Sequence, residues 1–248
     1  MSSAKHDTSA VVPVGYMWPN YAREEYPLGV RTGIGIVYSL TSSRRVGNPF
    51  FNPTHSLNDR IDDAKTMDTV DHAHFAGIPW CALHLQGDRI ITRTPLCRTL
   101  KPANEDSLFG DTLSSERGIV RMLQVYEGPS SQTGRIEGLK VFLTLASGLN
   151  GHANVCHGGL VMTILDEALS LLVGINQEHG GISGKTFLTA YLNTSFVKPV
   201  WTPTTILART CLTKVEGRKC FARGTMEDEH GAILARADSL FILVKSFL

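Results

Sequence analysis

A single apolar stretch, residues 157–175, constrains the fold more than any other part of this chain of 248 residues. It begins His-Gly-Gly at residues 157–159, and almost every position in 160–175 is apolar, so no polar stripe marks a face for solvent. A helix that is hydrophobic on all sides is normally buried. We expect the stretch to be too short, and too interrupted by Asp166 and Glu167, to span a bilayer. The sequence therefore predicts one long helix inside the core.

Two features of this helix indicate that it carries functional groups of a binding or catalytic site. Its first N–H groups have no partner within the helix, and the helix dipole makes this end positive. Gly158 and Gly159 carry no Cβ, so an oxygen atom can approach those N–H donors closely. Asp166 places a carboxylate in the buried helix, which is costly unless the group is paired, hydrogen-bonded or used. The helix thus combines an oxyanion-binding start with a carboxylate further along.

The spacing of these features limits how they can act together. Asp166 lies eight residues beyond Gly158, about 12 Å along a helix that rises 1.5 Å per residue. One small carbonyl group cannot contact both. Either the two serve different ends of a ligand, or two copies of the helix lie antiparallel and Gly158 of one subunit meets Asp166 of the other. The second arrangement predicts a two-fold dimer with two active sites at its interface.

Composition narrows the function class. A net charge of +1 gives no electrostatic reason to expect nucleic acid or an anionic membrane surface as a partner. Five cysteines without a Cys-x-x-Cys pair favour reduced thiols over a disulfide framework or a zinc ribbon. The histidines His72, His74 and His84 lack matching ligand spacing, so we expect no metal site. The first residues contain no apolar signal segment, and we expect a cytoplasmic protein, with the mitochondrion as the alternative.

The chain divides by its patterns into two parts. Residues 1–110 are predicted to be a partly irregular N-terminal extension that packs on the rest, with a short strand over 30–40 and some helix over 59–86. The stretch 94–111 contains prolines and polar residues and is typical of a linker. Residues 111–248 are predicted to be one domain.

The sequence of this domain predicts several strands, then one helix, then more strands. Alternating or apolar runs predict strands at 118–127, 139–145, 186–197, 204–215, 218–226 and 232–244. Glu216-Gly217 and residues 228–231 are hairpin turn signals. Strands, a long buried helix and then an antiparallel meander indicate an α+β fold, in which a curved sheet wraps around a single helix.

Four pieces of sequence, HGGLVMTILDEA, FLTAYLNTSFVKP, LTKVEGRKCFARG and LARADSLFILV, occur in this order between about Arg117 and Val244. Together they resemble the hotdog-fold acyl-CoA thioesterases, of the phenylacetate-degradation type and of the animal thioesterase superfamily. The resemblance implies a homodimeric hydrolase that cleaves acyl-CoA, or an acyl group on a carrier protein, to free acid and thiol in lipid or polyketide metabolism. Two dimers pairing is an open alternative. Coenzyme A would be part of the substrate, and no cofactor is implied.

The resemblance also implies roles for single residues. The Gly158 N–H would polarise the thioester carbonyl, with help from Gly159. Asp166 of the facing subunit would attack the carbonyl or activate water. Thr189, on the strand after the helix, would orient that carboxylate or the water, and we expect its hydroxyl to donate a hydrogen bond to Asp166. His157 would border the site and support the loop.

One position departs from the family pattern. Many relatives have Asn or Gln about six residues before the His, where this chain has Gly151. Asn150, His152 or Asn154 would have to bind the carbonyl or position water in its place.

Basic residues are the candidates for binding the phosphates of coenzyme A. Lys198, Arg209, Arg218 and Lys219 are available, with solvated surface charge as the alternative for each.

Two further side chains have open or plainer interpretations. Glu167 lies about 100° around the helix from Asp166, which favours a salt-bridge or rim residue over a catalyst. Strict strand alternation puts Thr189 on the face opposite Leu192, so the pattern does not establish that Thr189 faces the helix.

Two other functions compete with thioester hydrolysis. One is a hydro-lyase or isomerase of a biosynthetic pathway on the same scaffold, because a fold alone does not determine the chemistry. The other is a non-catalytic partner protein whose surfaces matter more than its pocket.

Overall fold

The long central helix predicted from the apolar stretch is α3, Gly158–Glu178. In the computed structural model it contacts β3, β6, β7, β8 and β9. Its buried apolar residues are Val161, Ile164, Leu165, Ala168, Leu169, Leu172, Val173 and Ile175. With 21 residues, α3 is long and apolar enough to cross a membrane by length and composition, so the length argument against a span was wrong. Its packing against the sheet accounts for the hydrophobicity instead.

The structure describes residues 68–101, 105–184 and 186–244. All of them belong to one compact unit within residues 52–248. The strand predicted over 30–40 and the part of the predicted helix before residue 68 lie outside the described residues. Within them, the expected helix is present at residues 68–76 and in α2, Pro79–Ala82.

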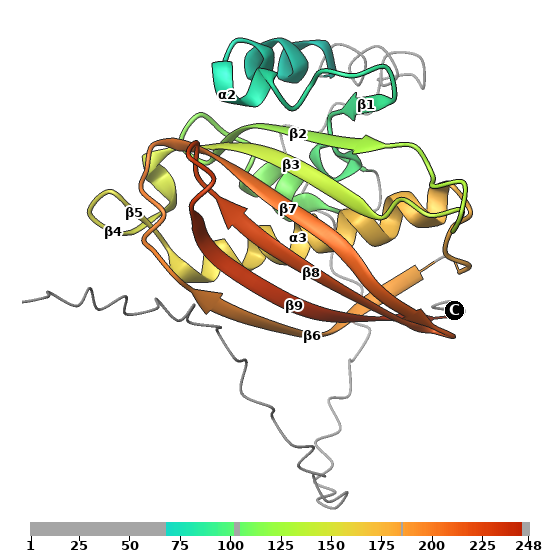
Figure 1. Ribbon diagram of the computed structural model, residues 1–248. Coiled ribbons are helices and arrows are strands. Elements are labelled where there is room, and N and C mark those ends of the chain that lie inside the picture. Colours follow the sequence, from blue (N-terminus) through green and yellow to red (C-terminus); the bar gives the residue numbers. More distant parts are fainter. Residues whose placement is uncertain (1–67, 102–104, 185, 245–248) are drawn as a thin grey trace, which may run out of the picture. The chain divides into compact units, whose positions relative to one another are not determined.

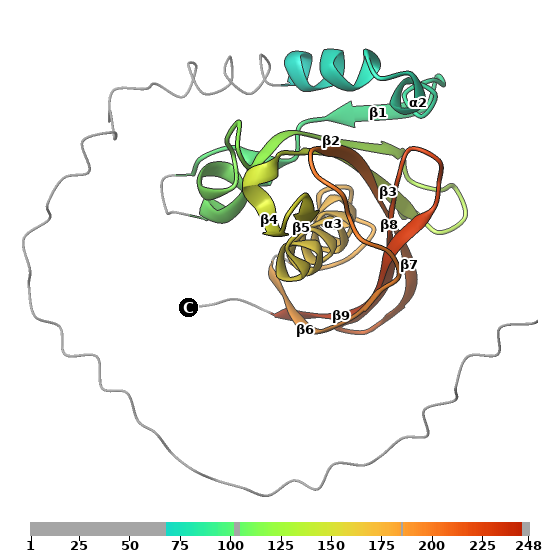
Figure 2. The same ribbon diagram turned by 90° about the vertical axis from the view of Figure 1, so that its left-hand side faces the viewer.

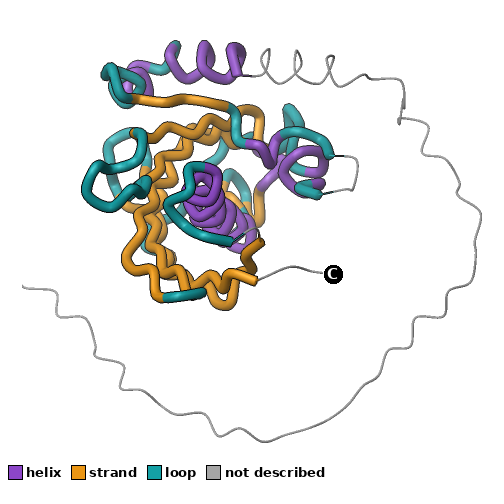
Figure 3. Tube along the Cα trace, turned by 90° about the vertical axis from the view of Figure 1, so that its right-hand side faces the viewer, coloured by secondary structure: helices purple, strands orange, loops and turns teal. Residues whose placement is uncertain are grey.

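A curved antiparallel sheet covers one side of α3. Its seven strands run in the order β1-β2-β3-β7-β8-β9-β6. Their bounds are β1 Ile90–Arg93, β2 Ile119–Glu127, β3 Gly138–Leu145, β6 Thr186–Phe196, β7 Thr204–Glu216, β8 Lys219–Glu227 and β9 Ile233–Val244. Figure 1 shows α3 lying along the sheet, and the two end views in Figures 2 and 3 show the sheet bending around it. The predicted α+β hotdog architecture is confirmed.

The predicted strands differ from the observed ones by one residue at most at either end. In β8 and β9 burial alternates along the strand, because one face of each packs against α3. Two short elements were not predicted. These are β1 and the small hairpin of β4, Asn150–His152, and β5, Val155–Cys156.

The described part of the extension is built into the fold on both the edge and the outer face of the sheet. Strand β1 pairs with β2 in antiparallel register. The helix at 68–76 and α2 lie on the outer face, on the side away from α3 (Figure 2). They close a second apolar core there, formed by Phe75, Cys81, Leu123, Val125, Phe142 and Leu207.

The stretch 94–111 is not a linker, so that prediction is wrong. It contains two short helical turns, η1 Leu96–Arg98 and η2 Leu108–Thr112, which contact each other. Cys97 and Phe109 from these turns are buried in the main core. The prolines and polar residues of the stretch suggested solvent exposure, but two well-placed apolar side chains are enough to hold it on the domain.

A buried arginine joins the extension to the sheet. The Arg98 guanidinium donates from Nη1 to the Phe109 carbonyl and from Nη2 to the Ile119 carbonyl, each at 3.0 Å. The buried Asp71 carboxylate accepts a hydrogen bond of 2.8 Å from the Thr94 hydroxyl. Burial raises the pKa of Asp71, while this hydrogen bond and the charge of Arg98 act in the opposite direction. The extension is therefore held by polar contacts as well as by apolar packing.

Replacing Arg98 with methionine is expected to lower the free energy of unfolding by about 3 kcal/mol or more, because two hydrogen bonds from a charged donor are lost in the core. Urea unfolding followed by circular dichroism measures this. The matched control is Arg89→Met, which removes an exposed ion pair with Glu127 and should cost about 0.5 kcal/mol or less. Equal effects of the two variants would contradict the anchoring role of Arg98.

Candidate active site

The start of α3 presents one free backbone donor. His157 is the N-cap residue, with an extended backbone, and its Nδ1 accepts a hydrogen bond of 3.0 Å from the Gly159 N–H. The Gly158 N–H makes no hydrogen bond to any described residue. Of the two glycine donors considered from the sequence, Gly158 is thus the one left for an incoming oxygen. His157 therefore caps the helix start, and the Gly159 N–H is used by this cap.

The surroundings of the helix start explain the glycine at position 151. A Cβ on Gly151 would lie 3.0 Å from Cδ2 of the His157 ring and 3.1 Å from its Cα. An Asn or Gln there would force His157 to move, and the cap with it. His157 therefore occupies the space beside Gly151 that a Cβ would need.

The proposed substitutes for that amide lie in or next to the β4–β5 hairpin. Asn150 is engaged by the Thr202 hydroxyl, which donates to its Oδ1. His152 and Asn154 are exposed, and Asn154 has the left-handed φ of 59° that a tight turn requires. The structure brings these residues near the helix start but shows no direct contact between them and Gly158.

Asp166 and Thr189 form the polar pair expected from the sequence. The Thr189 hydroxyl donates a hydrogen bond of 3.0 Å to Oδ1 of Asp166. Burial raises the pKa of Asp166, and the hydrogen bond from Thr189 lowers it again in part. Asp166 is half-buried, and Thr189 is exposed on the edge strand β6. The carboxylate is thus held in place without being sealed from an approaching ligand.

A β-bulge decides which way Thr189 points. In the pairing of β6 with β9, Thr189 lies opposite Phe241, whereas Tyr191 lies opposite Leu240, so Ala190 is an extra residue. The bulge shifts the alternation by one position. Thr189 and Leu192 therefore share the face toward α3, which strict alternation had excluded.

The basic residues considered for phosphate binding are not brought together in one chain. Lys198 is exposed just after β6, at the end of the sheet where α3 begins. Arg218 and Lys219 lie in the hairpin between β7 and β8, where Lys219 pairs with Ile242 near the end of β9. That hairpin is at the opposite end of the sheet, near the C-terminal end of α3 (Figure 1).

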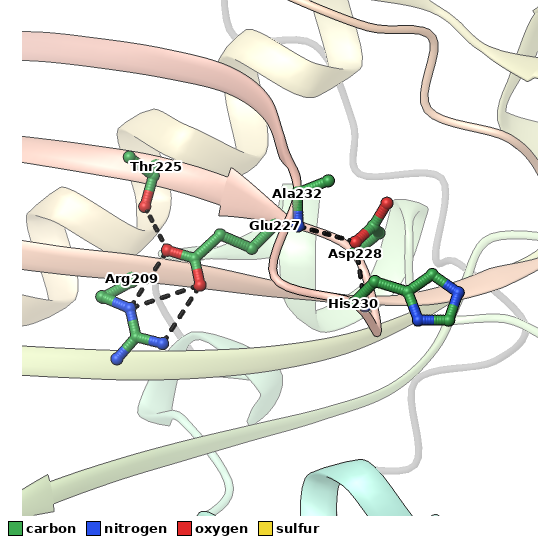
Figure 4. Close-up of polar contacts among 6 residues, drawn as sticks. All are labelled: Arg209, Thr225, Glu227, Asp228, His230 and Ala232. Atoms are coloured by element: carbon green, nitrogen blue, oxygen red, sulfur yellow. Dashed lines mark hydrogen bonds and ion pairs between the residues drawn. The ribbon is translucent and has the colours of Figure 1, made fainter. Parts of the chain in front are cut away.

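Arg209 is engaged elsewhere. It forms a two-pronged contact with Glu227, with Nε 3.1 Å from Oε1 and Nη2 3.1 Å from Oε2 (Figure 4). Thr225 donates to the same carboxylate. Burial opposes ionisation of Glu227, but these hydrogen bonds outweigh it and lower its pKa. Because its charge is already paired, Arg209 is a poor candidate for a phosphate.

Glu167 was predicted to be a salt-bridge or rim residue. It forms no ion pair with any described residue, so a salt bridge is excluded for that part of the chain. Burial raises the pKa of Glu167 to about 7. The buried Cys97 thiol lies close enough to act on the pKa of the Glu167 carboxyl group, which it lowers. No signal in the sequence pointed to this proximity, because the two residues are far apart along the chain.

His74, His84 and Cys156 are engaged in contacts or burial within the fold. His74 Nε2 is 2.8 Å from the Thr144 hydroxyl, and the His84 ring lies against Phe142. Burial raises the pKa of the Cys156 thiol to about 11, which disfavours the thiolate that a nucleophile would need. No group of three potential metal ligands is found among residues that the structure describes.

The contact between Thr189 and Asp166 makes a prediction that needs no substrate. Thr189→Val removes the donor while keeping the shape, so the pKa of Asp166 should rise further above its usual range. Thr189→Ser keeps the hydroxyl and should leave the pKa close to wild type. Carbon NMR titration of labelled aspartate side chains measures both. An unchanged Asp166 titration in the valine variant would show that the hydrogen bond is absent in solution.

Comparison with known proteins bears on this arrangement. Residues 153–235 match the family model of the thioesterase superfamily. An uncharacterized protein of Schizosaccharomyces pombe is 34% identical over 110 residues, which cover 43% of this chain and 60% of the yeast protein. The match therefore spans less than two thirds of that relative's length.

Solved structures with a similar backbone include the PaaI protein of the phenylacetic acid degradation operon of Escherichia coli. It is 14% identical, with a TM-score of 0.38 and coverage of 43% of this chain and 72% of that protein. A Bacillus halodurans protein solved with CoA is 24% identical, with a TM-score of 0.37 and coverage of 42% and 66%. The match to the thioesterase superfamily covers α3 and strands β6, β7 and β8 of the hotdog fold that this chain adopts.

Proposed function

We propose that this protein is a thioester hydrolase that cleaves acyl-CoA, or an acyl group on a carrier protein, to free acid and thiol. One observation carries the proposal. The helix that the family match covers has a free Gly158 N–H at its start and the half-buried pair of Asp166 and Thr189 further along. These are the two groups that thioester hydrolysis requires: a donor for the developing oxyanion, and a carboxylate for the nucleophilic step.

The chemistry follows from these positions. The thioester oxygen accepts a hydrogen bond from the Gly158 N–H, and the positive end of the helix dipole stabilises the negative charge that forms on it. Asp166 either takes a proton from the attacking water, or attacks the carbonyl carbon itself and forms a mixed anhydride that water then hydrolyses. On either route the C–S bond breaks, and the thiolate leaves and takes up a proton to give the free thiol. Burial raises the pKa of Asp166, which makes it a stronger base, and the hydrogen bond from Thr189 opposes this rise by favouring the ionised form.

The two groups belong to different subunits in this proposal. They are about 12 Å apart along one helix, too far to act on one carbonyl group. Strand β6 is the edge of the sheet and exposes the apolar side chains Leu188, Tyr191 and Phe196. An unpaired apolar edge strand readily accepts a second strand. We propose a two-fold dimer in which β6 edges pair and the helices run antiparallel, so that Gly158 meets the partner's carboxylate.

The surroundings of Gly158 suggest where the substrate lies. A Cβ at Gly158 would be 3.6 Å from the ring of Phe196, so this exposed ring borders the donor. Lys198 follows two residues later and is the phosphate-binding candidate at this end of the sheet. We propose that Lys198 contacts the coenzyme A part of the substrate.

Proline at position 158 gives a direct test of the oxyanion donor. Proline lacks the N–H but suits the first position of a helix, and the extended backbone of His157 is compatible with a following proline. Gly158→Pro should therefore lower kcat for thiol release from acyl-CoA by about 10²–10³. Gly158→Ala keeps the N–H, and its Cβ would make an ordinary contact with Phe196, so most activity should remain.

Asp166→Asn should abolish thiol release from a panel of short-, medium- and long-chain acyl-CoAs while leaving the fold intact. Circular dichroism confirms the fold of each variant. Near wild-type turnover in the asparagine or the proline variant would refute the assigned roles. A change in the acyl chain without thiol release would favour the hydro-lyase or isomerase, and no reaction at all would favour the non-catalytic partner.

Mixing the two inactive variants tests whether the site is shared between subunits. If Gly158 and Asp166 act across the interface, a mixed dimer of Gly158→Pro and Asp166→Asn chains has one intact site and one doubly altered site. Random exchange makes half of the dimers mixed, with one of two sites active, so about a quarter of wild-type activity should return. Mixing after denaturation and refolding, with each variant refolded alone as control, measures this. No recovery would place both groups in one subunit.

A further inference from the structure

One strip along α3 is less buried than the rest of the helix. It consists of four residues at intervals of four, none of them buried: Gly158, Met162, Asp166 and Ser170. Residues four apart lie on the same face of a helix, one turn above the other. We call these four residues the open strip. It carries both groups assigned to thioester hydrolysis, the Gly158 N–H and the Asp166 carboxylate.

Met162 is the large apolar side chain of the open strip. It is 36% exposed, whereas its neighbours Val161 and Ile164 are buried in the core. Its position is halfway between Gly158 and Asp166, about 6 Å along the helix from each. An unbranched, flexible methionine side chain adapts its shape to whatever fills the space beside it. The open strip therefore places an apolar group between the oxyanion donor and the carboxylate.

The antiparallel dimer proposed above gives this midpoint a special place. When Gly158 of one helix lies opposite Asp166 of the other, the residue halfway between them lies opposite its own copy. The two Met162 side chains then meet at the two-fold axis. Helices that pack together have axes about 8–10 Å apart, a distance that facing side chains fill. The paired methionines would therefore separate the two active sites of the dimer.

Strand β6 shows how the open strip is oriented relative to the sheet. Near the start of β6, Thr189 donates its hydrogen bond to Asp166. At the end of the strand, the Phe196 ring borders Gly158. Strand β6 therefore runs along the open strip in the direction opposite to α3.

This orientation determines where the two ends of a thioester substrate lie. Lys198 follows Phe196 at the end of the sheet where α3 begins. It therefore lies beyond Gly158, on the side away from Met162. With coenzyme A extending toward Lys198, the acyl group extends the other way along the open strip. The acyl chain then points at the two-fold axis.

We propose that the two Met162 side chains form the end wall of both acyl-binding sites and so restrict the enzyme to short acyl chains. This inference rests on the proposed hydrolase and its two-fold dimer. A short chain ends before the axis, whereas a longer one would have to displace the methionines and enter the second site. One additional methylene in a filled apolar pocket changes kcat/KM by about 10–200-fold. A wall of two methionines is therefore enough to separate short chains from long ones.

Cysteine cross-linking tests the position of Met162 without any substrate. Four of the five cysteines are buried and Cys211 is exposed, so the variants also carry Cys211→Ser. Met162→Cys should form a disulfide between subunits on mild oxidation, because facing helices bring Cα atoms within the required distance of about 4.4–6.8 Å. The product is a band of twice the chain mass on a non-reducing gel.

Ser170→Cys is the matched control for cross-linking. Ser170 belongs to the same open strip but lies about 12 Å along the helix from the midpoint, so its copy is about 24 Å away. This variant should remain a single chain on the gel. Any pattern other than a cross-link at position 162 alone would overturn the placement of Met162 at the axis, and the end wall with it.

Met162→Ala tests the end wall itself. Thiol release is measured from straight-chain acyl-CoAs between acetyl-CoA and palmitoyl-CoA. Wild type should prefer the short members of this series. The alanine variant should raise kcat/KM for long chains relative to short ones by about tenfold or more, because the wall is removed. Leu83→Ala shortens an apolar side chain that is 70% exposed next to α2, and should leave the chain-length profile unchanged.

The results distinguish failure of this inference from failure of the proposed function. If thiol is released but Met162→Ala keeps the wild-type chain-length profile, Met162 only packs the interface and the inference is wrong. A wild-type preference for long chains would overturn it as well. Absence of thiol release from every member of the series would instead refute hydrolysis of acyl-CoA, and the end wall would fall with it.

Discussion

The burial of one apolar helix organises this molecule. Along α3, fully buried residues such as Ile164, Leu165, Leu169 and Leu172 have left water, and each such side chain contributes about 1.5–3 kcal/mol. A flat sheet could cover only one face of such a helix. The observed sheet bends around it, and the turns η1 and η2 cover another side with Cys97 and Phe109. The curvature of the sheet and the docking of the extension both follow from the need to remove this helix from water.

Because most of the helix is surrounded, the places where it remains accessible become chemically significant. Its start exposes a backbone donor at Gly158, and its uncovered side carries Asp166, held by Thr189. The same uncovered side ends at the edge strand β6, with its exposed apolar side chains. One physical condition, an incompletely wrapped helix beside an open sheet edge, therefore produces both the candidate site and the surface proposed for a second subunit.

Much of the fold could be predicted because the signals are local. Apolar or alternating runs form β2, β3 and β6 to β9, and turn residues mark many of their ends, so the bounds of these strands were predicted within one residue. The candidate residues at the helix start could also be predicted from local sequence. The letters His-Gly-Gly at 157–159 show directly that the helix begins with two residues that lack a Cβ. The predictions failed where distant residues decide the outcome. The stretch 94–111 looked like a linker, yet Phe109 is buried there. Glu167 was expected to be a salt-bridge or rim residue, and it forms no ion pair with any residue that the structure describes.

The sequence by itself determined the central helix, the meander that follows it, and the residue types that could perform acyl chemistry. These properties depend on periodicity and on backbone groups, which a chain carries wherever it folds. The tertiary structure alone decided which of those groups meet. A single extra residue in β6, Ala190, turns Thr189 toward Asp166, because a bulge shifts the alternation by one position. The cap by His157 selected Gly158 over Gly159 as the free donor. Such choices depend on register and on contacts across long stretches of chain, and no local pattern encodes them.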